Sequence, residues 1–276
     1  MPNLTIEKLS ATIGAEVQGV DEERLLHDES LPAQLLDSLD ANGVLLFRQM
    51  HLEDQIQVEF CKRLAPVVAV PSHPIPEISV ISLDPAKTPV AEYLKGAFDW
   101  HIDGTTDEIP NMATVMSAKV INAEDGGTEF ASTYAAYDDL TDAEKDRFAG
   151  LRVLHSFEAH QRRRNPNPTP EQEAYMKSRP RREHPLVWRH QNGRCSLVLG
   201  ATVDHVVGMD RNDGRTLLQG LLDRATRPQR VYRHDWTVGD LIIWDNRGLL
   251  HRACPYEATS SRELHRTTLV GDEPIQ

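Results

Sequence analysis

The chain has 276 residues, of which 39% are hydrophobic and 26% are charged, the proportions of an ordinary globular protein whose core needs no disulfide or structural metal to fold. Its 42 acidic and 30 basic side chains give a formal net charge of −12, so phosphate backbones and anionic lipid surfaces would repel it, and we expect neither nucleic acid nor a membrane as a partner. The sequence contains no apolar run of about 18 residues and no basic and apolar leader, and we therefore expect a cytoplasmic protein.

The predicted elements are a few helices and many short strands. Apolar residues at helical spacing predict helices over residues 31–40 and 52–64, and the apolar run at 43–47 between them predicts a buried strand. Short apolar runs bounded by turn residues predict further strands at 78–83, 112–120, 196–199 and 241–244. Neither a repeat nor a linker divides the chain, so the pattern indicates a mainly β protein with added helices and a single domain over residues 1–276.

Residues 151–195 differ from the rest of the chain in charge. They hold ten Lys and Arg against four Asp and Glu, a net charge of +6 that leaves −18 for the remainder. The proline-rich sequence at 162–170 predicts neither a regular helix nor a central strand. We therefore expect a basic, proline-rich excursion at about 158–185. It is either a solvated loop that balances acidic neighbours or a mobile basic cover over a site for anionic ligands.

A histidine and an aspartate stand two residues apart in the sequence WHID, at His101 and Asp103. On an extended strand, positions i and i+2 point to the same face, so both side chains can reach one metal ion. Twelve His and 22 Asp predict about one such pair by chance, so the motif is equally compatible with an ordinary hydrogen-bonded pair. A metal site needs a third ligand.

The apolar strand and turn that end at His251 can supply this ligand. Two imidazoles and one carboxylate form the facial triad of non-haem Fe(II) oxygenases, although zinc accepts the same ligands. Arg262 and Arg266 follow, four residues apart. Guanidinium groups bind carboxylates through paired N–H donors, so two of them in one cleft indicate small acidic molecules; the alternative is surface ion pairs with neighbouring glutamates.

Several motifs carry a resemblance to a known family. They are IGAEVQGVD at 13–21, VLLFR at 44–48, WHID at 100–103, GGTEF at 126–130 and VGDLIIWDNR at 238–247, followed by His251, Arg262 and Arg266 at spacings of 11 and 15 residues. Together they resemble the 2-oxoglutarate-dependent dioxygenases of the taurine dioxygenase and 2,4-dichlorophenoxyacetate dioxygenase family. The resemblance extends from about residue 4 to residue 272, and its last third is more similar to the phenoxyacetate branch.

The resemblance implies a ligand set. His101, Asp103 and His251 would bind Fe(II), which 2-oxoglutarate would chelate. The distal carboxylate of 2-oxoglutarate would meet Arg262 and the hydroxyl of Thr128.

The family usually has an aspartate directly before this threonine, and the present chain lacks it, so a shift of one residue would change the assignment of Thr128. Thr128 would otherwise be a strand-edge hydroxyl. Arg266 would face the anionic group of the primary substrate or help to hold 2-oxoglutarate.

The family fold is a double-stranded β-helix, the jelly roll of clavaminate synthase and taurine dioxygenase, with the metal at its mouth. The implied reaction uses O₂ to convert 2-oxoglutarate into succinate and CO₂ while a small anionic substrate is hydroxylated. We expect an aryloxyalkanoate-like carboxylate as this substrate, with alkylsulfonates of the taurine type or alkyl sulfates as alternatives. The enzyme would be a monomer or a homo-oligomer, as a dimer or tetramer.

Substrate contacts are expected from loops, and the candidates are Lys95 and the stretch 66–76, which contains His73. Lys95 would otherwise be a solvated loop lysine. Two functions from other classes use the same ligands. One is a jelly-roll protein that binds a metal and a dicarboxylate without turnover, and the other is a zinc hydrolase, although no general base is evident near either motif.

Overall fold

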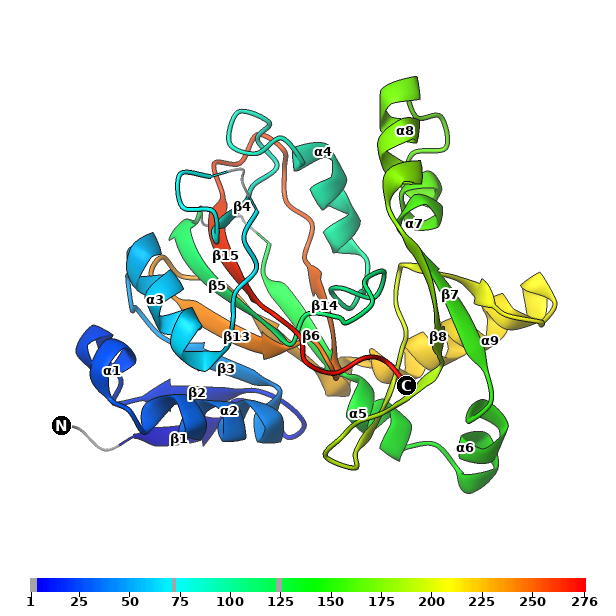
Figure 1. Cartoon of the computed structure of the whole chain (residues 1–276), viewed down its shortest axis with the longest axis horizontal. Coiled ribbons are helices and arrows are strands. Elements are labelled where there is room, and N and C mark those ends of the chain that lie inside the picture. The colour runs from blue at the N-terminus through cyan, green and yellow to red at the C-terminus, as the bar shows by residue number, and fades with distance from the viewer. Residues whose placement is uncertain (1–3, 71–72, 123–125) are drawn as a thin grey trace.

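The centre of the protein is formed by two facing β-sheets (Figure 1), and the computed structural model describes residues 4–70, 73–122 and 126–276. The larger sheet has the strand order β1-β2-β3-β13-β5-β15-β4. The bounds of its strands are Thr5–Lys8 (β1), Ala15–Gln18 (β2), Val44–Phe47 (β3), Ser79–Ile81 (β4), Ala113–Val120 (β5), Leu241–Asp245 (β13) and Glu263–Leu269 (β15). Of the pairs in this sheet, β2 and β3 are parallel and the others antiparallel.

The smaller sheet has the order β12-β6-β14, with all pairs antiparallel. Its strands are Thr128–Ser132 (β6), Val231–His234 (β12) and Leu249–Ala253 (β14). Phe130 of this sheet packs against Trp244 of the larger one, with ring centres 5.6 Å apart, and Met116 belongs to the same buried cluster. The two sheets form the double-stranded β-helix that the sequence predicted.

Three helices near the N-terminus pack beside β1–β3. They are Glu22–His27 (α1), Leu31–Asn42 (α2) and Asp54–Leu64 (α3). In α2 the buried residues Leu31, Leu35 and Leu39 recur every fourth position, so they form one apolar face that joins Phe47 in the core. The two helices and the strand predicted for this region are confirmed, as are the four further strands, observed as β4, β5, β10 and β13.

A third sheet has the strand order β11-β7-β8, and β9 and β10 pair as a two-stranded sheet. Figure 1 shows β7, β8 and the helix α9 on the side of the jelly roll opposite the N-terminal helices. The bounds in this part are Thr133–Asp138 (α5), Asp142–Phe148 (α6), Arg152–Ser156 (β7), Arg181–Pro185 (β8), Val187–Arg189 (β9), Cys195–Leu197 (β10), Val203–Val206 (β11) and Arg211–Ala225 (α9), with the 3-10 helix Pro228–Arg230 (η2). No helix among the described residues is long and apolar enough to cross a bilayer.

The basic excursion is more regular than the sequence predicted. The helices Phe157–Arg164 (α7) and Pro170–Ser178 (α8) lie between β7 and β8 in the chain, at the upper right of Figure 1. The prediction that residues 162–170 contain no regular helix is therefore wrong for 162–164, which complete α7 because the first proline stands only at position 166. Pro170 begins α8, where a missing N–H costs no helical hydrogen bond.

Candidate metal centre

His101 and His251, far apart in the sequence, are joined by an isolated antiparallel bridge. Each backbone N–H donates to the carbonyl of the other residue, at N···O distances of 3.0 and 2.9 Å. The expected strand through His101 and Asp103 is only partly correct, because residues 103–106 turn away with Gly104 at a φ of +81°. The bridge nevertheless places the two imidazole rings with their centres 4.2 Å apart.

Asp103 completes a cluster of three potential metal ligands. Its Oδ1 lies 3.6 Å from His101 Nε2 and its Oδ2 lies 3.9 Å from His251 Nε2. One ligand atom from each residue lies within 4.8 Å of the others. Two imidazole nitrogens and one carboxylate that leave the remaining positions open form the donor set of a facial triad, which Fe(II) prefers and Zn(II) also accepts.

The tautomer of His101 and the lowered pKa of His251 suit the binding of a cation. His101 Nδ1 lies 2.8 Å from the carbonyl oxygen of Asp99, which fixes the tautomer in which Nδ1 donates and Nε2 keeps its lone pair. Burial, and then the nearby His101, lower the pKa of His251 to about 3. The His251 ring can therefore bind a metal ion at neutral pH without first releasing a proton.

Asp103 is ionised, and a hydrogen bond orients its carboxylate. Burial opposes its ionisation, but the facing His251, Arg266 and His101 outweigh burial and lower its pKa. Its Oδ2 accepts a long hydrogen bond of 3.5 Å from Thr114 Oγ1, which in turn accepts one of 2.9 Å from Asn246 Nδ2. The sequence reasoning missed Thr114 and Asn246, although Asn246 lies within the WDNR motif that it singled out.

Arg266 lies beside the three ligands, as expected. Its Nη1 is 3.5 Å from Asp103 Oδ2, and the strand β15 that carries it is paired with β5. The Nε of Arg266 is buried and has no hydrogen-bond partner in the part of the chain that the structure describes. This N–H is therefore placed to receive an anion near the triad.

Thr128 is the first residue of β6 and pairs with Ala253 on one side and His234 on the other, so it is not a strand-edge residue. It is buried, and its Oγ1 accepts a hydrogen bond of 2.9 Å from the indole Nε1 of Trp236. Because that bond occupies an acceptor site, the hydroxyl proton is left to donate to an anion. Trp236 is a second residue that sequence reasoning missed.

Arg262 directly precedes β15 and is 1% exposed. Its guanidinium carbon lies 4.5 Å from the ring centre of Tyr256, and its backbone N–H donates to Ser260 Oγ. Its sequence neighbour Glu263 pairs instead with Lys87, at 2.8 Å. This depth of burial argues against the alternative interpretation, in which Arg262 forms an ion pair exposed on the surface.

Lys95 lies at the start of η1 (Lys95–Phe98), after the short helix α4 (Ala91–Leu94), and its side chain is exposed. It lines a cavity of about 400 Å³ together with Gln161 and Arg164, and none of the three triad residues lines that cavity. In the other proposed stretch, residues 71 and 72 lie outside the described part, and His73 Nε2 lies 3.9 Å from Asp54 Oδ2. The structure therefore places neither Lys95 nor His73 against the triad.

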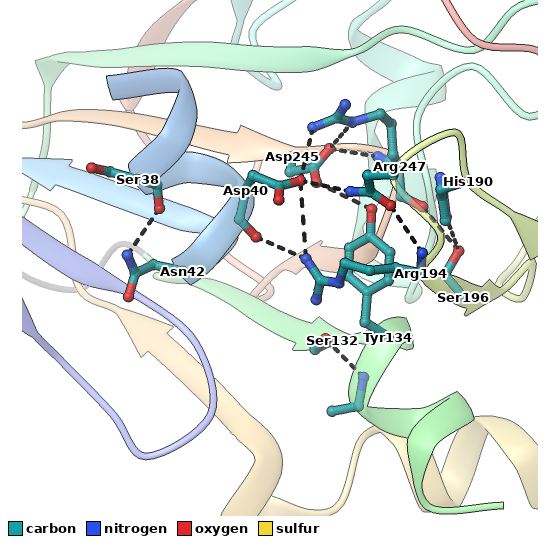
Figure 2. Close-up of polar contacts among 12 residues, drawn as sticks. Ser38, Asp40, Asn42, Ser132, Tyr134, His190, Arg194, Ser196, Asp245 and Arg247 are labelled. Carbon is teal, nitrogen blue, oxygen red and sulfur yellow. Dashed lines mark hydrogen bonds and ion pairs between the residues drawn. The ribbon is translucent and has the colours of Figure 1, made fainter. Parts of the chain in front are cut away.

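A polar network under the β13–β14 turn holds the strand that carries His251 (Figure 2). Asp245 is fully buried, and its Oδ1 accepts 2.8 and 3.0 Å hydrogen bonds from the Nε and backbone N of Arg247. The guanidinium of Arg194 stacks 3.7 Å from the ring centre of Tyr134, and a Cβ on Gly248 would meet that ring at 1.7 Å. Only glycine fits at this turn.

Comparison with known proteins gives one family over nearly the whole chain. Residues 5–268 match the family model of "Taurine catabolism dioxygenase TauD, TfdA family". The chain is 32% identical over 279 residues to an (S)-phenoxypropionate/alpha-ketoglutarate-dioxygenase of Sphingobium herbicidovorans, covering 98% of this chain and 96% of the relative. It is 34% identical over 259 residues to an alpha-ketoglutarate-dependent 2,4-dichlorophenoxyacetate dioxygenase of Burkholderia sp. (strain RASC), covering 87% and 86%.

Solved structures agree with the fold. The crystal structure of AAD-2 in complex with Mn(II) and N-oxalylglycine superposes with a TM-score of 0.83 at 28% identity, covering 99% of this chain and all of that one. A taurine dioxygenase from Burkholderia xenovorans superposes with a TM-score of 0.81 at 30% identity, covering 99% and 93%. The resemblance stated from the sequence motifs is thereby confirmed.

Proposed function

The chain belongs to the taurine catabolism dioxygenase TauD, TfdA family, and from this premise we propose that it hydroxylates a small aryloxyalkanoate-like carboxylate with Fe(II), 2-oxoglutarate and O₂. It is an enzyme of the 2-oxoglutarate-dependent dioxygenase class, as its relatives are. The observation that carries the proposal is the convergence of His101, Asp103 and His251 beside Arg266.

We propose that these three side chains hold the metal ion. When bound, the ion and 2-oxoglutarate supply the oxidation, in which the keto acid becomes succinate and CO₂ and one oxygen atom enters a C–H bond of the substrate. The protein orients the side chains that would bind the metal ion. The carbonyl of Asp99 orients His101, and Thr114 orients Asp103.

Arg262 and Thr128 are proposed to hold the distal carboxylate of 2-oxoglutarate. Arg262 contributes a buried positive charge, and Thr128 contributes the hydroxyl proton that its hydrogen bond from Trp236 leaves available. Gly126 and Trp236, which neighbour Thr128, line a cavity of about 730 Å³ with Asn122. Asn122 Nδ2 donates to Ser261 Oγ, directly before Arg262.

Arg266 is proposed to bind the carboxylate of the primary substrate through its buried, unpartnered Nε. The relatives are named for phenoxypropionate and 2,4-dichlorophenoxyacetate, both aryl ethers of small carboxylic acids. Hydroxylation of the carbon next to the ether oxygen of such an acid gives a hemiacetal, which collapses to a phenol and a 2-oxo acid. Lys95, the other expected substrate contact, lines a different cavity, so this proposal does not use it.

Substrate-stimulated succinate release tests the proposal. The purified chain is incubated in air with Fe(II), 2-oxoglutarate and either (S)-2-phenoxypropionate, 2,4-dichlorophenoxyacetate, taurine or hexyl sulfate, and succinate and phenol are both measured. We expect equimolar succinate and phenol with an aryloxyalkanoate. Turnover with taurine or hexyl sulfate alone would assign an alternative substrate class.

Two controls separate the other functions. Binding of 2-oxoglutarate without succinate under any substrate would identify a metal-binding protein without turnover, and activity with Zn(II) in the absence of O₂ would identify a hydrolase. A cytoplasmic location, a single catalytic domain over residues 1–276 and assembly as a dimer or tetramer stay predictions from the sequence.

A further inference from the structure

A cavity of about 790 Å³ lies behind the metal centre. Its volume is in the range of sites that bind small organic ligands. Its walls come from η1 and Trp100, from α7, from residues 199–204, from α9 and from Arg252 of β14. His101, Asp103 and His251 are not among its lining residues, so it is separate from the proposed catalytic site.

The cavity and the triad occupy opposite faces of the His101–His251 bridge. Side chains alternate along extended backbone, so Trp100 and Arg252 point away from the side on which the two histidines meet Asp103. The guanidinium carbon of Arg252 lies 4.6 Å from the ring centre of Trp100, and both line the cavity. A Cβ on Gly200 would lie 2.9 Å from the Trp100 carbonyl oxygen, so this wall rests directly on the bridge.

The floor of the cavity is apolar. Trp100 is 8% exposed and Leu199 is 1% exposed, and Leu218 and Leu222 of α9 pack against the same buried cluster. An aromatic or aliphatic group of a ligand can therefore be buried there.

The rim of the cavity is strongly basic. Five arginines line it, against two aspartates; they are Arg163, Arg164, Arg211, Arg215 and Arg252, facing Asp99 and Asp204. Arg252 also pairs with Glu129 at 2.7 Å, so an excess of two positive charges remains in a chain whose net charge is −12.

The two aspartates leave some of this charge unbalanced. Arg164 pairs with Asp99 at 2.7 Å and Arg211 pairs with Asp204 at 3.3 Å. Arg163 donates to the carbonyl oxygen of Ala201, and neither Arg163 nor Arg215 forms an ion pair with any residue that the structure describes.

We propose that this cavity binds a small amphipathic organic anion, an aryl or alkyl carboxylate. The apolar part of the ligand lies on Trp100 and Leu199, and its carboxylate meets Arg163 and Arg215. Guanidinium groups at the rim of an apolar floor match the two ends of such a molecule. The occupant would touch the reverse side of the bridge that carries two members of the triad.

Calorimetric titration with phenoxyacetate tests the proposal on the full chain in EDTA, without metal or 2-oxoglutarate. We expect two sites per chain in the wild type, of which Arg266→Ala removes one. Arg215→Glu, an exposed change on α9, should weaken the other site at least tenfold. Arg227→Glu has the same change of charge at an exposed position outside the cavity and should leave both sites unchanged.

Equal binding by the wild type and Arg215→Glu would overturn the proposal, and so would equal weakening by Arg227→Glu, which would show a general effect of charge. Binding that Arg266→Ala abolishes entirely would also overturn it. A site that Arg215→Glu weakens but Arg266→Ala spares would support this cavity even if the proposed substrate class of the catalytic site fails. If α9 does not tolerate glutamate, Arg163→Glu with Arg215→Gln provides the same comparison.

Discussion

Replacing Thr114 by valine tests how the metal ligand Asp103 is held. Both side chains carry two heavy atoms on Cβ, so the change removes one hydroxyl from a fully buried position on β5 and leaves the shape of the side chain nearly the same. That hydroxyl accepts the 2.9 Å hydrogen bond from Asn246 and donates the 3.5 Å bond to Asp103. Its loss leaves the buried Asn246 amide without this acceptor and one carboxylate oxygen without its orienting donor.

The two bonds predict two separate effects. An unsatisfied buried donor costs about 1–3 kcal/mol, so the free energy of unfolding of the metal-free chain should fall by that amount. Outer hydrogen bonds to ligands typically contribute about 10–100-fold to metal affinity, equivalent to about 1.4–2.7 kcal/mol. Because the bond to Asp103 is long, we expect a loss of Mn(II) affinity near tenfold rather than a hundredfold.

The stability effect is measured by urea unfolding and the binding effect by titration with Mn(II), which avoids oxidation. Thr267→Val is the matched control, since Thr267 is equally buried and accepts a 3.1 Å hydrogen bond from the amide of Gln57. Gln57 also donates to the carbonyl of His265, so the control should lose no more stability than Thr114→Val and no metal affinity. An unchanged Mn(II) affinity in Thr114→Val, or an equal loss in the control, would refute the reasoning.

His101→Ala should abolish succinate formation while leaving cooperative thermal unfolding intact, because a chain of 276 residues folds on its buried core; loss of the calorimetric transition would make the metal structural. Arg262→Ala should raise the KM for 2-oxoglutarate about 10–150-fold and the KM of the primary substrate far less, since a charge-assisted hydrogen bond contributes about 1.5–3 kcal/mol. Initial rates are measured with each substrate varied in turn. An unchanged KM for 2-oxoglutarate would show that this role of Arg262 is wrong. Burial lowers the pKa of His155 from 6.5 to about 3, so the unfolded chain binds the extra proton between these values and stability should fall as the pH drops from 6.5 to 3, by up to about 1.4 kcal/mol per pH unit. Urea unfolding of His155→Gln at several pH values should show a shallower slope in this window, and identical slopes would exclude His155 as the cause.

Local patterns predicted the elements that are determined by local chemistry. The spacing of Leu31, Leu35 and Leu39 is sufficient to define one buried face of α2, and the apolar run at 241–244 predicted a buried strand, which the structure places between β3 and β5. The residue types of the triad were likewise visible in the sequence, but their meeting was not. His101 and His251 are joined by one bridge; their residue types made His251 a candidate, and the resemblance to a family assigned it to the same site as His101.

For the same reason, the sequence analysis missed or misplaced residues whose contacts join different elements of the fold. Thr114 and Asn246 lie on different elements, and no sequence periodicity relates the hydroxyl of one to the amide of the other. Lys95 stands only six residues before His101 in the sequence, yet η1 turns the chain between them, and Lys95 lines a different cavity. Proximity along the chain predicts proximity in space only where the backbone between two residues is regular.

The positive charge of the excursion shows how composition alone can mislead. Arg162 pairs with Glu158 and Glu173, and Arg181 pairs with Glu158, so much of the charge is balanced within the segment.

The link from this segment to the metal strand is different in kind. Asp99 receives hydrogen bonds on its carboxylate from His160 and Arg164 of α7, while its backbone carbonyl faces His101 Nδ1. One residue thus ties α7 to the orientation of a metal ligand. A displacement of α7 would have to break both contacts, so the position of α7 is coupled to the metal centre through Asp99.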